Sequence, residues 1–77
     1  MSYPTIISPS ARQVIEELER ARKKFPGRFN SMHEGYAVIL EELDEAWAEI
    51  KADNRDAARA EMVQVAAMAL RFLEDTQ

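Results

Sequence analysis

The stretch that decides the fold is SMHEGYAVILEELDEAWAEIK, residues 31–51. It opens on a capping box, in which Ser31 caps the first turn and Glu34 reaches back to the cap. No proline follows, and apolar side chains recur at steps of three and four residues, which predicts an amphipathic helix over 31–51. Six residues form a continuous apolar stripe that we expect to pack into a core: Tyr36, Ile39, Leu43, Ala46, Trp47 and Ile50.

The residues before this stretch predict an arm and a first helix. Residues 1–8 are expected to be irregular. Ser8-Pro9 is a typical helix start, because Ser caps a helix and Pro suits its first position. Periodic apolar residues then continue to the breaker Pro26-Gly27, which predicts a helix over 9–24. We interpret the basic stretch at the end of this helix, residues 20–24, as a solvated helix terminus.

The residues after it predict a third helix, over 55–74, started by the turn and cap at Asp53-Asn54. No strand-like alternation occurs, so residues 1–77 form one all-α domain, a three-helix up-down unit with short loops. The apolar side chains of the third helix cover every direction around its axis: Met62, Val63, Val65, Ala66, Ala67, Met68, Ala69, Leu70, Phe72 and Leu73. Two short neighbours cannot bury such a helix, which predicts a homodimer or homotetramer, a larger helical bundle joined through 55–74.

Composition and charge exclude several classes of protein. The chain has 77 residues and no cysteine, so disulfides and thiolate metal sites are excluded. No apolar run approaches the roughly 20 residues of a membrane span, and the start does not resemble a signal peptide, so we expect a cytoplasmic protein with no membrane partner. Residues 31–77 carry four basic and eleven acidic residues, a net charge of −7, which argues against binding a nucleic-acid polymer.

Two helices each carry a pair of polar residues at a spacing of three. On 31–51, the carboxylates of Glu42, Glu45 and Glu49 fall within about 60° of one another. On 55–74, Glu61 and Gln64 are among the few strongly polar residues. If the two helices are antiparallel and face each other, Glu42, Glu45, Glu61 and Gln64 converge.

A convergent set of three carboxylates and an amide predicts a site for Mg²⁺, or for Mn²⁺, because these ions prefer hard oxygen ligands. The chemistry that such a site suggests is hydrolysis of a phosphoanhydride. Two other interpretations stay open. The acidic residues of 31–51 can be a solvated face, and Glu61 can form a buried salt bridge with Arg12, Arg28, Arg59 or a partner subunit's arginine.

The same residues resemble a known family. Glu-Glu-x-x-Glu on one helix followed by Glu-x-x-Asp on the next is the signature of the all-α nucleoside triphosphate pyrophosphohydrolases, which include MazG. Residues 41–45, EELDE, match the first half, and residues 61–64, EMVQ, match the second with Gln64 in place of Asp. The resemblance covers roughly residues 31–74. It implies Mg²⁺-dependent cleavage of an NTP or dNTP to the monophosphate and pyrophosphate, in a dimer or tetramer.

The resemblance also implies roles for individual residues. Glu42, Glu45, Glu61 and Gln64 would be the metal ligands, and Glu41 and Glu42 the catalytic residues, with Glu41 a further ligand or the group that orients the attacking water. Lys51, Arg55 and Arg59, near the turn between the two helices, would hold the substrate phosphates. An amide oxygen adds no negative charge, so Gln64 implies weaker metal binding than the Asp of the family.

Two functions of other classes remain. One is a non-catalytic, oligomeric binding module that keeps the scaffold of the family, which Gln64 favours. The other is an acidic surface that mimics nucleic acid and blocks a basic partner. Phe25 and Phe29 flank Pro26-Gly27 and either line a nucleotide pocket or close the end of the bundle, and a lone His33 is interpreted as surface or cap chemistry.

Overall fold

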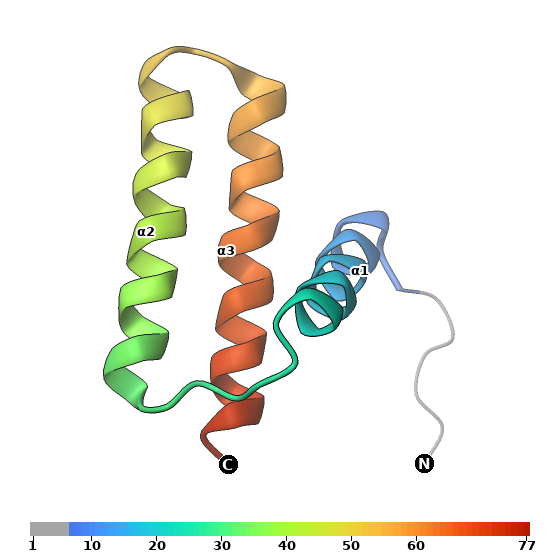
Figure 1. Ribbon diagram of the computed structural model, residues 1–77. Coiled ribbons are helices and arrows are strands. Elements are labelled where there is room, and N and C mark those ends of the chain that lie inside the picture. The colour runs from blue at the N-terminus through green and yellow to red at the C-terminus, as the bar shows by residue number, and fades with distance from the viewer. Residues whose placement is uncertain (1–6) are drawn as a thin grey trace.

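The computed structural model describes residues 7–77 and holds three helices (Figure 1), α1 (Pro9–Lys24), α2 (Met32–Lys51) and α3 (Arg55–Asp75). The described residues contain no strand, so the all-α prediction is confirmed. Each helix begins and ends within one residue of its predicted range. Of the predicted arm, residues 1–6 lie outside the described part. None of the helices found in residues 7–77 has both the length and the apolar character that crossing a membrane requires.

Each helix begins at a side-chain cap. The Ser8 hydroxyl accepts the N–H of Ala11 at 3.1 Å, and the Ser31 hydroxyl accepts the N–H of Glu34 at 3.1 Å. The Glu34 carboxylate reaches back one residue further than a capping box requires, to the N–H of Asn30 at 2.9 Å. These contacts satisfy N–H groups that have no partner inside the helix, which is why the predicted starts are so close.

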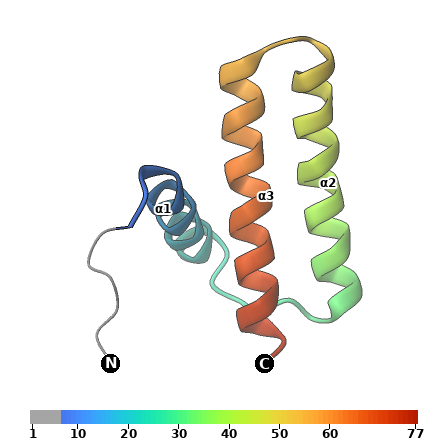
Figure 2. The same cartoon turned by 180° about the vertical axis from the view of Figure 1, so that it is seen from behind.

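Helices α2 and α3 form an antiparallel hairpin, and they lie side by side in both views (Figures 1 and 2). The turn between them contains Asp53, whose φ of 56° is left-handed, a conformation that Asp tolerates better than most residues. At the other end of α2, Gly35 allows a close approach. A Cβ on Gly35 would lie 2.6 Å from a ring carbon of Phe72 and 3.1 Å from one of Phe29.

Helix α1 departs from the predicted up-down arrangement. It packs against α3 and not against α2, and in Figures 1 and 2 it is viewed nearly end-on while the hairpin stands upright. The prediction of three helices running up and down was therefore wrong for α1. The physical reason lies in the connection after α1, where Phe29 inserts into the core and its N–H donates to the Asp75 carboxylate at 3.0 Å.

The core lies where α1 and the connection meet the hairpin. Its buried members are Leu18, Phe29, Ala67 and Met68, with Val14, Ala21, Val38, Ile39 and Phe72 packed against them. Two residues of the apolar stripe that was expected to form the core on α2 face solvent, since Tyr36 is 64% and Trp47 54% exposed. Placing these two in the core was wrong for the single chain. Helix α2 instead turns its small buried residues, Gly35 and Ala46, toward α3, because small residues allow two helices to approach closely.

Candidate functional site: a carboxylate cluster beside a pocket

Three carboxylates from two helices meet in the hairpin. Glu42 and Glu45 of α2 and Glu61 of α3 each offer one oxygen, and these oxygens all lie within 4.8 Å of one another. Glu42 and Glu61 are half-buried and Glu45 is exposed. The antiparallel pairing sets the middle of α2 against the first half of α3, and the spacing of three places Glu42 and Glu45 on adjacent turns.

Each of the two half-buried carboxylates has one oxygen without a hydrogen-bond partner. One oxygen of Glu42 and one of Glu61, the Oε2 atom in each, are buried without a hydrogen bond. Among residues 7–77 no ion pair reaches Glu61, so the alternative of a salt bridge to an arginine of the same chain is not found there. Arg28, one of the arginines considered for it, donates to the carbonyl of Glu74 at 3.3 Å. Buried carboxylate oxygens with no partner are costly, and a cation among them would remove that cost.

The proximity of these groups changes their acidity. Burial, followed by the charges of Glu45, Glu61 and Glu41, raises the pKa of Glu42 to about 7. Burial also raises the pKa of Glu61, with further contributions from the neighbouring carboxyls of Glu45 and Glu49. Protons and a divalent cation therefore compete for the same oxygens near neutral pH.

The cluster fits a hard divalent cation. It offers only carboxylate oxygens, and the two unpartnered oxygens are available as ligands. Mg²⁺ and Mn²⁺ bind such donors, whereas Zn²⁺ favours nitrogen and sulfur. Three protein ligands leave coordination positions for water and for phosphate oxygens.

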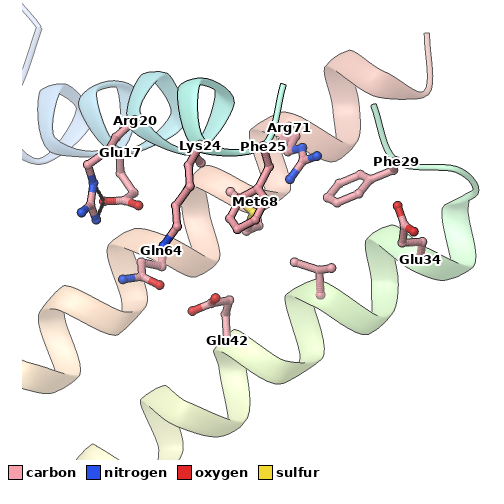
Figure 3. Close-up of a pocket in the computed structure, with 12 residues that line it drawn as sticks. Glu17, Arg20, Lys24, Phe25, Phe29, Glu34, Glu42, Gln64, Met68 and Arg71 are labelled. Carbon is pink, nitrogen blue, oxygen red and sulfur yellow. Dashed lines mark hydrogen bonds and ion pairs between the residues drawn. The ribbon is translucent and has the colours of Figure 1, made fainter. Parts of the chain in front are cut away.

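A pocket of about 570 Å³ adjoins the cluster and lies between α1 and the hairpin. Glu42 belongs to both the cluster and the pocket, and Gln64 lines the pocket from α3 (Figure 3). Gln64 and Glu42 therefore line the same pocket, from α3 and α2. The other residues lining it are Glu17, Arg20, Ala21, Lys24, Phe25, Phe29, Glu34, Val38, Met68 and Arg71.

The remaining predicted site residues lie outside this arrangement. Glu41 is exposed and belongs neither to the cluster nor to the pocket, although its charge acts on Glu42. Arg59 lines a neighbouring hollow that shares Gln64 with the pocket. Lys51 lies over the ring of Trp47, 5.5 Å from its centre. Arg55 is exposed in the first turn of α3.

Three cationic residues at the pocket were not predicted as site residues: Arg20, Lys24 and Arg71. Arg20 and Lys24 line it from α1, within the basic stretch that we interpreted as a solvated helix end. The high positive charge of that stretch was visible in the sequence. Its position was not, because it depends on how α1 crosses α3. No family model, curated protein or solved structure matches the chain.

Proposed function

We propose that this chain is a MazG-like, Mg²⁺-dependent nucleoside triphosphate pyrophosphohydrolase, with Mn²⁺ as a possible substitute. The observation that carries the proposal is the convergence of Glu42, Glu45 and Glu61, with two buried oxygens that have no partner. An adjoining pocket of about 570 Å³ supports it, because ligand pockets for small molecules typically have volumes of about 300–1,000 Å³.

The proposed reaction cleaves the anhydride between the α- and β-phosphates of an NTP or dNTP. Water adds to phosphorus, the bond to the bridging oxygen breaks, and the monophosphate and pyrophosphate leave. A bound divalent cation supplies Lewis acidity, which makes water more acidic and neutralises phosphate charge. Glu42, Glu45 and Glu61 would hold it, with Gln64 as a neutral fourth ligand. Glu41 stays a predicted water-orienting residue.

The test is release of pyrophosphate from a panel of NTPs and dNTPs, with Mg²⁺ or Mn²⁺. We expect turnover in the wild type and a loss of at least about 100-fold in Glu42→Gln, which keeps the shape of the side chain but removes a ligand charge, because second-shell changes alone cost about 10–100-fold. Asp44→Asn is the matched control, since Asp44 is an exposed acid of α2 outside the cluster and the pocket. Equal activity in the three proteins would refute a role of the cluster.

A second candidate function is a non-catalytic, oligomeric binding module. Gln64 favours it, because a neutral amide lowers the charge available to hold a cation, and so do the exposed apolar side chains of α2. This candidate predicts no turnover with any nucleotide and a melting temperature that Mg²⁺ and nucleotides leave unchanged. Gln64→Asp then becomes informative, since activity gained in that variant would show that a missing ligand charge silences the site.

A further inference from the structure

We propose that α1 forms the phosphate-binding wall of the site, with Lys24 as the residue that binds the substrate phosphates across the pocket from Glu42. The inference rests on the proposed function, because it assigns a role within the same site. It differs from the expectation that Lys51, Arg55 and Arg59 hold the phosphates. None of those three lines the pocket.

The two walls of the pocket carry opposite charge. Glu42 and Gln64 contribute oxygen atoms from the hairpin, whereas Lys24 and Arg20 contribute cations from α1 (Figure 3). In Figure 3 the Lys24 side chain extends from α1 toward Gln64, on the side of the pocket that Glu42 faces. A polyphosphate between the walls would meet the Lys24 ammonium on one side and a cation held by the carboxylates on the other.

Lys24 is the available cation of that wall. Arg20 is already paired with Glu17, at 2.5 Å. Arg71, another cation at the pocket, donates to the carbonyl of Gly27 at 2.9 Å and stacks on Phe29 at 4.2 Å. Lys24 forms no ion pair among residues 7–77, and its ammonium lies 5.5 Å from the ring centre of Phe25. An ammonium on a flexible stem binds phosphate oxygens as a point charge.

Apolar side chains also line the pocket and suit the nucleoside. Phe25, Val38 and Met68 line it together with Phe29. The ring of Phe29 is buried and stacked against Arg71, whereas Phe25 is 57% exposed. Any of the nucleobases can stack on an exposed aromatic ring, because every base has a π-face. We therefore place the base against Phe25, with the phosphates toward Lys24 and the carboxylates.

The first experiment measures kcat and KM for the best nucleotide in the wild type, Lys24→Gln and the control Lys23→Gln. Lys23 is the exposed neighbour of Lys24 in the last turn of α1 and does not line the pocket. We expect kcat/KM to fall at least tenfold in Lys24→Gln and to stay within twofold in Lys23→Gln. Stabilisation by Mg²⁺ alone, measured as a thermal shift, should be equal in the three proteins. Turnover with an unchanged kcat/KM in Lys24→Gln would overturn the inference and leave the proposed function standing.

The second experiment is independent of turnover. Binding of inorganic tripolyphosphate and of the nucleotide panel is measured by calorimetry with Ca²⁺ in place of Mg²⁺. We expect Lys24→Gln to weaken both ligands and Phe25→Ala to weaken only the nucleotides. Such a pattern without any turnover would support this binding mode while the hydrolase proposal fails. Tripolyphosphate affinity that is equal in wild type and Lys24→Gln would overturn the role of Lys24, and equal losses of both ligands in Phe25→Ala would overturn the placement of the base.

Discussion

Gly35 shows how one missing side chain sets the distance between two helices. Adding a Cβ there creates a contact of 2.6 Å with Phe72, in a part of the core that is already filled. Overpacking of this kind costs about 1–3 kcal/mol, against a gain of about 1 kcal/mol from the better helix propensity of Ala. We expect Gly35→Ala to lower the melting temperature. Gly27→Ala is the control, because nothing lies within 4 Å of a Cβ at Gly27. A melting temperature that rises in both variants would contradict the close packing at Gly35.

The raised pKa of Glu42 makes stability depend on pH. The folded protein holds a proton on Glu42 up to about pH 7, whereas the unfolded chain releases it near 4.5. Stability from this group is complete below pH 4.5 and is lost as pH rises through 7. Without divalent metal, we expect the melting temperature to fall between pH 5 and 8 in the wild type. The raised pKa of Glu61 acts in the same direction.

The variant Glu42→Gln isolates that effect. It should show a weaker pH dependence and melt several degrees above the wild type at pH 8, since each kcal/mol shifts the melting temperature of so small a domain by about 4–8 °C. Mg²⁺ should stabilise the wild type at pH 8 and leave the variant almost unchanged. Identical pH profiles of the two proteins, measured by circular dichroism, would show that the Glu42 carboxyl is well solvated.

At the scale of the elements, helix boundaries were predictable and helix faces were not. Boundaries are set by neighbours in sequence, such as the Ser31 hydroxyl on the N–H of Glu34. The convergence of Glu42 and Glu61 was also predictable, because it needs only the spacing on each helix and an antiparallel hairpin. The face of α2 that meets α3 is set by tertiary packing. Hydrophobicity predicted that the face with Trp47 would be buried, whereas the buried face is the one with the small residue Ala46.

The exposed side of α2 carries its own prediction. Tyr36, Leu40, Leu43, Trp47 and Ile50 are all exposed and follow one another at alternating steps of four and three, the spacing of a helix–helix seam. We therefore propose that copies of this chain associate through α2, together with the exposed Met62 and Leu73 of α3, the helix that the sequence predicted as the interface. Sedimentation velocity should show a dimer or larger species in the wild type.

The matched variants place the same charge on and off that seam. Trp47→Glu should dissociate the assembly at micromolar concentration without loss of helix content, because it buries a carboxylate in an apolar contact. Ala48→Glu adds the charge at the next residue, which is exposed but outside the spacing of the seam, and should leave the assembly intact. A monomeric wild type, or equal behaviour of the two variants, would exclude association through this face.

At the scale of the whole molecule, the placement of α1 depends on contacts between distant parts of the chain. Asp75, whose side chain is only 3% exposed, accepts the N–H of Phe29 at 3.0 Å and pairs with Arg22 at 3.0 Å. Burial alone would raise the pKa of Asp75, but these two partners together with Arg71 hold it below its usual value. Contacts between residues some fifty positions apart leave no local pattern in the sequence. The steep crossing of α1 over α3, and with it the position of Lys24, therefore could not be predicted from the sequence.

Those distant contacts also have a consequence for the order in which the chain acquires its structure. The hairpin of α2 and α3 closes through a three-residue turn, a local event with a small entropic cost. Among the helices of residues 7–77, α1 packs only on α3, and the ion pair that holds it there, Arg22 with Asp75, spans 53 residues. During synthesis α1 therefore leaves the ribosome before the hairpin and is held in place only after the final turn of α3 has emerged. The cationic wall that faces the carboxylates is therefore completed only after Asp75 has been added.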